Sequence, residues 1–77
     1  MKTVNIVLNE LESARQKHPQ FETAHHGYAV IKEEVDEMWD AIKADDMPQA
    51  IKESYQVAAM AIRFIEDLSH KLAKVKK

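Results

Sequence analysis

Five carboxylates lie within the ten residues IKEEVDEMWD, which span positions 31–40. Such a group of acids forms either a solvated helix face or a set of ligands for a divalent cation. At about 100° per residue on a helix, three of the acids lie nearly opposite the apolar side chains and are expected to be solvated: Glu33, Asp36 and Asp40. Glu34 and Glu37 lie three residues apart beside the apolar face, so their carboxylates can converge on one point. Like charges this close destabilise a helix unless a cation separates them.

A further carboxylate interrupts the apolar face of the next predicted helix. That face consists of residues that repeat at helical spacing: Val57, Met60, Ala61, Phe64, Leu68 and Leu72, with Ile65 beside them. One turn earlier the same face contains Glu53, and Gln56 follows on its flank. Burial of a lone carboxylate costs several kcal/mol unless the group is paired or coordinated. A functional site is expected where an apolar pattern is broken in this way.

The two pairs of polar residues can meet if their helices pack antiparallel. The pair that begins at Glu34 would then face the pair that begins at Glu53. Oxygen ligands of this kind suit Mg²⁺ or Mn²⁺. A salt-bridged bundle core, with Lys52 or Arg63 as counter-ions, fits the same spacing. The sequence therefore leaves two interpretations open, a metal site and an ion-paired core.

Three helices are expected to position these residues. Helix-forming residues dominate the chain, which has one glycine, two prolines and no useful alternation of apolar and polar residues. We predict helices over residues 3–18, 24–44 and 48–74. Pro19 ends the first helix. Thr23 caps the start of the second, and Asp45, Asp46 and Pro48 mark the break before the third.

The apolar residues of the first two helices define the rest of the expected core. In the first helix they are Val4, Val7, Leu8, Leu11 and Ala14. In the second helix they are Tyr28, Ile31, Val35, Met38, Trp39 and Ile42. Three helices with short connections bury only part of these faces. We therefore predict an all-α chain with a single domain, residues 1–77, whose three helices form a four-helix-bundle core by homo-oligomerisation.

Composition excludes several other classes of protein. A chain of 77 residues without cysteine holds at most one domain, and it has neither disulfides nor thiolate metal ligands. The net charge of −2 gives no electrostatic basis for binding nucleic acid. No apolar run approaches the roughly 18 residues of a membrane span, and no signal-peptide pattern opens the chain. A cytoplasmic protein with neither nucleic-acid nor membrane partners is therefore expected.

Two short motifs in the predicted helices resemble a known family. The segment EEVDE, residues 33–37, fits the EExxE signature of the MazG-like, all-α nucleoside triphosphate pyrophosphohydrolases. The second signature of that family, ExxD on the next helix, falls on ESYQ, residues 53–56. The similarity extends from His25 to Leu68, and the first predicted helix adds little to it.

The resemblance implies a helical dimer or tetramer that cleaves nucleoside triphosphates between the α- and β-phosphates, giving the monophosphate and pyrophosphate. It also implies a requirement for Mg²⁺, and Mn²⁺ suits the same ligands. The family pattern places the metal ligands at Glu34, Glu37, Glu53 and the position of Gln56. Gln56 departs from the pattern, because an amide oxygen can bind Mg²⁺ but contributes no charge.

The same resemblance suggests which residues act on the substrate. Glu33 or Glu37 would be the general base that orients the attacking water. Arg63 or Lys52 would neutralise the leaving pyrophosphate.

Two aromatic residues and one histidine are candidates for contacts with the nucleoside. Trp39 or Tyr28 would stack on the base, although core packing is the commoner role for aromatic residues on an apolar face. His25 matches the histidine that opens the HxGYAVI-like stretch of the family, so it would lie on the substrate side of the site.

A second class of function remains open. A non-catalytic MazG-like helical oligomer, acting as an interaction or regulatory module, is favoured by the loss of charge at Gln56. A coiled-coil adaptor is disfavoured, because the apolar spacing follows 3.6 residues rather than a sustained heptad, and regular charge pairs flanking the seam are missing.

Overall fold

The computed structural model describes residues 1–75 of the chain. These residues form four helices: α1 (Lys2–Lys17), α2 (Ala24–Lys43), α3 (Met47–Leu68) and α4 (His70–Val75). The prediction of an all-α chain is confirmed, since no strand occurs among the described residues. None of the helices in this part of the chain has the length and apolar character that a membrane span requires.

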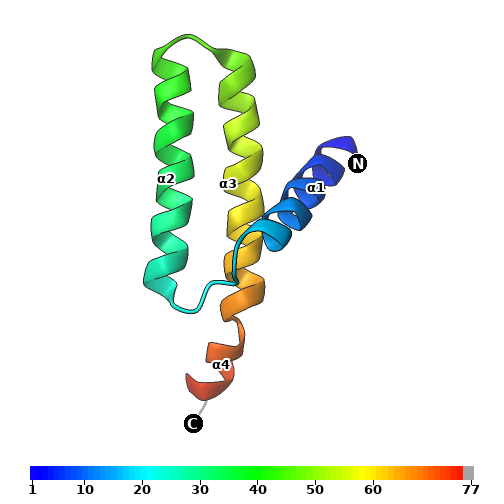
Figure 1. Ribbon diagram of the computed structural model, residues 1–77, viewed down its shortest axis with the longest axis vertical. Coiled ribbons are helices and arrows are strands. Elements are labelled where there is room, and N and C mark those ends of the chain that lie inside the picture. Colours follow the sequence, from blue (N-terminus) through cyan, green and yellow to red (C-terminus); the bar gives the residue numbers. More distant parts are fainter. Residues whose placement is uncertain (76–77) are drawn as a thin grey trace.

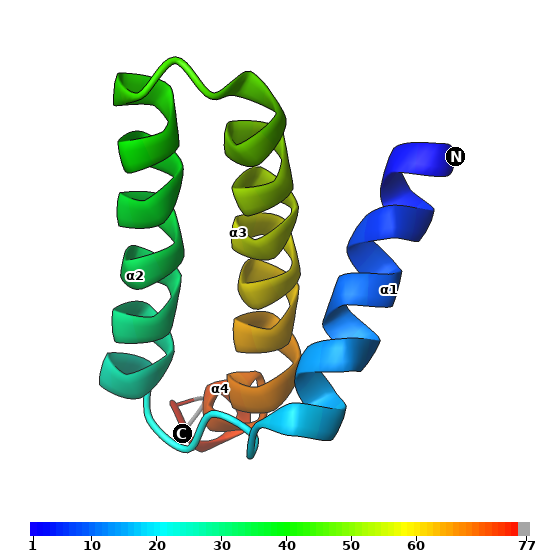
Figure 2. The same ribbon diagram turned by 45° about the horizontal axis from the view of Figure 1, so that its top comes forward.

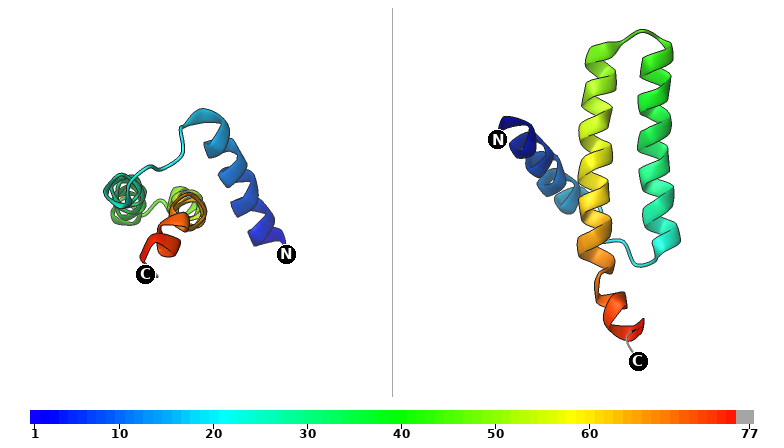
Figure 3. Two further views of the ribbon diagram at one scale, coloured as in Figure 1. Left: turned by 90° about the horizontal axis from the view of Figure 1, so that it is seen from below. Right: turned by 180° about the vertical axis from the view of Figure 1, so that it is seen from behind.

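Helix α3 is the centre of the fold. It forms an antiparallel hairpin with α2, and α1 packs obliquely against another side of it (Figure 1). The N-terminal end of α1 diverges from the hairpin, whereas its C-terminal end stays close to α3 (Figure 2). Seen along the hairpin, α3 lies between α1 and α2 (Figure 3). Both outer helices therefore depend on α3 for the burial of their apolar side chains.

The connections follow the local chemistry that the sequence predicted. The side chain of Thr23 caps α2 by accepting a hydrogen bond from the backbone N–H of His26 at 3.0 Å. Asp46 caps α3 in the same way, with the N–H of Gln49 at 3.2 Å. Between the two helices Asp45 has a φ of 58°, in the left-handed region that Asp tolerates better than most residues. These caps satisfy donors that a helix start leaves unpaired.

The hydrophobic core lies between the C-terminal half of α1, the α1–α2 connection and α3. Its buried members are Leu11, Ala14, Phe21, Ala59, Met60 and Leu68. The apolar stripe predicted for α1 is therefore buried only in part, since Val4 and Leu8 remain exposed. This difference follows from the oblique packing of α1, which takes its first turns away from α3.

A buried arginine anchors the end of α1 to α3. Arg63 is only 2% exposed, and its terminal nitrogens donate hydrogen bonds to the carbonyls of Ala14 and His18 at 3.2 and 2.7 Å. Its Nε lies 3.3 Å from the carboxylate of Asp67, which also accepts the backbone N–H of Phe21. The arginine thus satisfies carbonyls that a helix C-terminus leaves free, and its charge suits the negative end of the α1 dipole.

Glycine at position 27 permits the close approach of α2 to its neighbours. A Cβ atom at Gly27 would lie 2.6 Å from the ring of Phe64 and 3.1 Å from that of Phe21. Real Cβ atoms essentially never lie within 3.0 Å of another non-bonded atom, so any side chain here would force the ring of Phe64 or the helices to shift. Gly27 therefore serves the packing of α2 against its neighbours.

The face of α2 that packs on α3 differs from the predicted one. Gly27 and Ala41 are buried, whereas Tyr28 is 63% exposed and Trp39 is 55% exposed. Val35 and Ile42 of the predicted core face are exposed as well. Within one chain, α2 therefore turns its small residues toward α3 and leaves most large apolar side chains uncovered. The physical reason is that small residues allow the two helix backbones to approach closely.

The third predicted helix is interrupted near its end. α3 ends at Leu68, Ser69 follows, and α4 begins at His70, whereas the sequence predicted one helix to residue 74. The hydroxyl of Ser69 donates a hydrogen bond to the carbonyl of Ile65, four residues earlier. A serine that bonds back in this way competes with the helix ladder and bends the chain. Leu72, predicted as part of the apolar stripe, is exposed beyond this bend.

Candidate metal centre

Three of the predicted metal ligands converge across the α2–α3 hairpin. Glu34 and Glu37 extend from successive turns of α2, and Glu53 extends from α3. One carboxylate oxygen from each residue can be chosen so that all of them lie within 4.8 Å of one another. We call Glu34, Glu37 and Glu53 the carboxylate triad. The antiparallel packing of the hairpin thus produces the convergence that the spacing of the acids required.

The triad is partly removed from water. Glu53 is only 7% exposed, Glu34 is half-buried and Glu37 is exposed. Burial, followed by repulsion from Glu37, raises the pKa of Glu34. A hydrogen bond with Glu53, followed by burial, raises the pKa of Glu37. Both shifts favour the protonated, neutral form of these carboxyl groups, and this form reduces the repulsion among the three groups when no cation is bound.

The basic side chains of the described residues form their ion pairs elsewhere. These pairs are Arg15–Glu66, Lys32–Asp36, Lys43–Asp40 and Arg63–Asp67. The predicted counter-ions of a salt-bridged core were Lys52 and Arg63, but Lys52 is exposed and Arg63 pairs with Asp67. The geometry thus gives no support to an ion-paired core around the triad. Three convergent carboxylate oxygens fit a hard divalent cation such as Mg²⁺.

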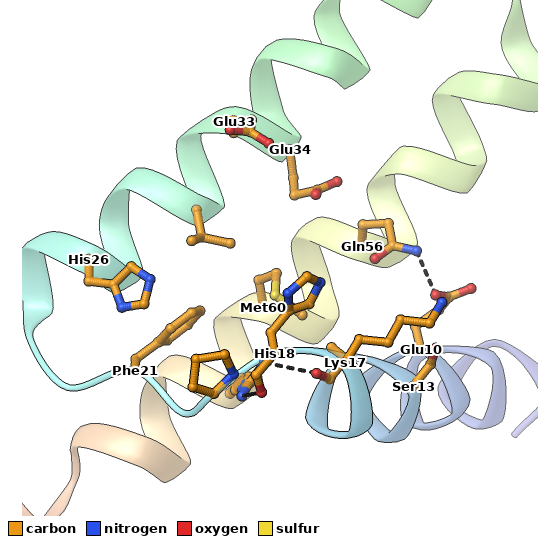
Figure 4. A pocket seen from close by; sticks show the side chains of 14 residues that line it. Glu10, Ser13, Lys17, His18, Phe21, His26, Glu33, Glu34, Gln56 and Met60 are labelled. Carbon is orange, nitrogen blue, oxygen red and sulfur yellow. Dashed lines mark hydrogen bonds between the residues drawn. The ribbon is translucent and has the colours of Figure 1, made fainter.

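The fourth predicted ligand has a different partner. The amide nitrogen of Gln56 donates a hydrogen bond to Oε2 of Glu10 on α1, with a distance of 2.5 Å between the two atoms. Figure 4 shows the two side chains reaching toward each other from α3 and α1, with Glu34 across from them on α2. Gln56 therefore connects the hairpin to α1, 46 residues away in sequence.

A cavity of about 340 Å³ lies directly beside the triad. Its wall combines α1, the α1–α2 connection, α2 and α3 (Figure 4). Glu34 belongs both to this wall and to the triad, and Gln56 and Glu10 lie next to it. Phe21 and His26 form the opposite end, where their rings pack edge to face with centroids 5.3 Å apart. The cavity has the size of a small-molecule site and both polar and apolar ends.

The remaining predicted residues take varied positions around this cavity. Glu33 is exposed and lines the cavity edge. His25 is exposed and does not belong to the cavity wall, whereas its neighbour His26 does. Trp39 also lies outside the wall, with the ammonium of Lys43 5.7 Å from its ring centre.

Arg63 differs most from its predicted role. It lines the cavity, but its guanidinium is occupied by the carbonyls of α1 and by Asp67, and it lies over the ring of Phe21 at 5.2 Å. These contacts make Arg63 a residue that positions α1, and its charge is already balanced. The expected contact between Arg63 and a leaving pyrophosphate finds no support in this arrangement.

The contribution of α1 to the site was not predicted from the sequence. Glu10, Ser13 and Lys17 line the cavity from that helix. They recur at three- and four-residue intervals beside the buried pair Leu11 and Ala14, which is the pattern of a polar stripe at the edge of an apolar one. That stripe was the available signal, but it does not reveal which other helix it faces.

The site thus combines three convergent carboxylates with an adjoining cavity whose wall joins all three long helices. A hard cation at the triad would lie at one end of that cavity, within reach of a ligand bound in it. Comparison of the chain with protein-family models, with curated proteins and with solved structures finds no match in any of the three.

Proposed function

We propose that the protein hydrolyses nucleoside triphosphates to nucleoside monophosphates and pyrophosphate in a Mg²⁺-dependent reaction. The observation that carries this proposal is the convergence of Glu34, Glu37 and Glu53 within 4.8 Å at the end of a cavity. The same positions match the two MazG-like signatures that the chain resembles at residues 33–37 and 53–56. The proposal therefore rests on site geometry and on two short motifs together.

Glu34, Glu37 and Glu53 would hold the cation. Their carboxylates supply the oxygen ligands and the negative charge that Mg²⁺ and Mn²⁺ require. When bound, the ion neutralises the phosphate oxygens and lowers the pKa of a coordinated water. Gln56 contributes no charge and is bonded to Glu10, so the site relies on three carboxylates where the family pattern has four.

The acids of the chain also provide a proton acceptor. Glu37 is exposed and Glu33 lies at the cavity edge, so either carboxylate is open to a water molecule. A carboxylate oxygen of Glu37, or of Glu33 at the cavity edge, accepts a proton from the attacking water. The water oxygen bonds to the α-phosphorus, the bond from this atom to the α,β-bridging oxygen breaks, and pyrophosphate leaves with that oxygen. Lys52, which is exposed on α3, is the candidate residue for neutralising the negative charge of the leaving pyrophosphate.

The proposed enzyme is a homodimer or tetramer built on a four-helix bundle. Large apolar side chains are uncovered on α2 and α3: Tyr28, Val35, Trp39, Ile42, Ile51 and Ile65. A shallow apolar groove between these helices is lined by Tyr28, Ile31, Ala61, Phe64 and Ile65. A second α2–α3 hairpin is the occupant of matching chemistry, since an isologous contact pairs the same apolar face twice.

A non-catalytic interaction module is the second candidate. The observation in its favour is Gln56, an uncharged residue at the fourth ligand position, which is bonded to α1. Such a module would keep the fold and the oligomer without chemistry at the triad.

A direct assay separates the two candidates. Purified protein is incubated with a panel of ribo- and deoxyribonucleoside triphosphates and Mg²⁺, and released pyrophosphate is measured. The proposed enzyme releases pyrophosphate from at least one of them, and Glu53→Gln abolishes the release. Glu12→Gln is the matched control, because Glu12 is exposed on α1 and does not line the cavity. No release at high protein concentration would discard the enzyme and favour the interaction module.

A further inference from the structure

The order of side chains along the cavity indicates how a nucleotide would lie in it. Glu34 of the triad and the bonded pair Glu10 and Gln56 face each other across the same end of the cavity, and Phe21 and His26 form the far end (Figure 4). A nucleotide whose phosphates bind at the triad would place its sugar beside the pair. Its base would point toward the aromatic end. This reading of the cavity rests on the proposed function.

Glu10 offers this ligand an acceptor. One of its carboxylate oxygens, Oε2, accepts the hydrogen bond from Gln56, and Oε1 accepts none from the described residues. An ionised carboxylate only accepts hydrogen bonds, so its free oxygen selects a ligand group that donates one. Sugar hydroxyls are such donors, and acidic side chains bind them in dinucleotide sites. The neighbouring acids Glu33 and Glu34 make the same region unfavourable for an additional anion.

The position of Glu10 is fixed from both sides. Arg63 ties the end of α1 to α3 through the carbonyls of Ala14 and His18, and Leu11 is buried against the core. Gln56 then orients the carboxylate itself. A group held by packing and by a hydrogen bond loses little freedom when a ligand binds, which is a requirement for a selective contact.

The same contact accounts for the residue at position 56. An aspartate there, as in the family pattern, would place a second negative charge beside Glu10, and carboxylates do not donate hydrogen bonds when ionised. The amide of Gln56 donates instead. Glutamine in place of the aspartate of the motif therefore allows a hydrogen bond that orients Glu10 in the cavity wall.

We propose that Glu10, oriented by Gln56, is a specificity-determining residue that accepts a hydrogen bond from a sugar hydroxyl of the bound nucleotide. The cavity then prefers nucleosides and nucleotides with a 2′- or 3′-hydroxyl over their 2′,3′-dideoxy counterparts. The aromatic end, formed by Phe21 and His26, receives the base.

Binding of nucleosides without metal tests this contact apart from catalysis. Isotope-labelled protein is titrated with adenosine, 2′-deoxyadenosine, 3′-deoxyadenosine and 2′,3′-dideoxyadenosine, and amide chemical shifts are followed by NMR. We expect chemical-shift changes at the amides of Ser13, His26 and Gln56. The affinity for the dideoxynucleoside should be about 10-fold lower than that for adenosine, because one hydrogen bond to a charged group is lost. The two monodeoxynucleosides show which hydroxyl makes the contact.

Substitutions assign the preference to Glu10. Glu10→Ala brings adenosine and its dideoxy analogue to nearly equal affinity, while Glu12→Ala, an equal charge change on the exposed side of α1, keeps the preference. The proposal would be overturned if the unaltered protein bound adenosine and dideoxyadenosine with equal affinity. It would also be overturned if Glu10→Ala kept the preference for adenosine, or if millimolar nucleoside caused no chemical-shift changes around the cavity.

Pyrophosphate release distinguishes this proposal from the proposed function. If pyrophosphate is released from ATP and dideoxy-ATP at equal rates in the presence of Mg²⁺, the proposed enzymatic function is retained and the proposed role of Glu10 is rejected. Selective nucleoside binding that Glu10→Ala abolishes, without release from any triphosphate, would support the sugar contact and remove the catalytic function.

Discussion

The amide of Gln56 on α3 donates a hydrogen bond to the carboxylate of Glu10 on α1, with 2.5 Å between nitrogen and oxygen. This contact joins two segments that the sequence separates by 46 residues. It also places position 56 in the cavity wall, although the motif alone predicted a metal ligand there. The triad of Glu34, Glu37 and Glu53 is left as the set of candidate metal ligands.

Loss of this hydrogen bond should reduce stability. We expect Gln56→Ala to lower the free energy of unfolding by about 1 kcal/mol, since the acceptor is charged and the pair is partly buried. Gln56→Asp should cost more because it adds repulsion from Glu10. Urea denaturation measures both, and the extra cost of Gln56→Asp should disappear when Glu10→Ala is present as well. Additive effects of Glu10→Ala and Gln56→Asp would contradict the pairing.

The triad should make the metal-free protein less stable at neutral pH. Burial raises the pKa of Glu34, and the hydrogen bond with Glu53 raises the pKa of Glu37, both above the ordinary value of 4.5. The folded state therefore binds these protons more tightly than the unfolded chain. Their stabilising contribution is complete below pH 4.5 and is lost as the pH rises through the raised values.

Denaturation in the presence of EDTA at a series of pH values measures this loss. Glu37→Gln should flatten the decline in unfolding free energy between pH 4.5 and neutral pH. Glu12→Gln should leave it unchanged, since that residue is exposed on α1. A decline of the same size in Glu37→Gln would show that the folded state does not raise the pKa of Glu37.

Substitution of Arg63 separates its packing role from a role toward substrate. Arg63→Lys keeps the charge but cannot reproduce the contacts with two carbonyls and Asp67, so it should lower stability by about 2 kcal/mol. Hydrogen exchange should show the largest loss of protection in α1, which Arg63 anchors. A variant of unchanged stability that releases pyrophosphate more slowly would instead support a contact with the leaving group.

The proposed oligomer depends on the apolar side chains of α2. Val35→Lys introduces a charge into that face, and it should produce monomers in size-exclusion chromatography with light scattering. Val35 is 38% exposed within one chain and does not belong to its hydrophobic core, so the substitution leaves that core intact. Asp36→Lys, on the solvated side, should leave the assembly unchanged. Monomers in the unaltered protein would remove the four-helix bundle.

Local signals were sufficient to predict the helices of the chain. Pro19, Thr23 and Asp46 act on backbone groups a few residues away, and the observed ends of α1 and α2 and the start of α3 lie close to the predicted positions. The end of α3 was not predicted. The carbonyl of Ile65 accepts a hydrogen bond from the hydroxyl of Ser69, which competes with the backbone hydrogen bonds of the helix, and the sequence alone does not show which pattern prevails. The face of α2 that packs within one chain was predicted only in part: Ile31 packs against the core, but Gly27 and Ala41 add little to an apolar pattern.

The triad could be predicted because it depends on two regular spacings and one hairpin. Glu34 and Glu37 are separated by three residues, and a glutamate at an apolar position identified Glu53. The cavity could not be predicted, because its wall depends on contacts between α1 and α3. The bonds from Arg63 to Ala14 and from Gln56 to Glu10 span 49 and 46 residues, and no periodicity within one helix reveals them.

Binding of a divalent cation to the triad tests the central claim most directly. Titration calorimetry with Mg²⁺ or Mn²⁺ should show one ion per chain. Glu53→Gln should weaken binding at least about 10-fold, because loss of a direct ligand costs no less than loss of its supporting contacts. Glu12→Gln should bind as the unaltered protein does. The absence of saturable binding, or equal affinity in Glu53→Gln, would contradict a metal centre formed by Glu34, Glu37 and Glu53.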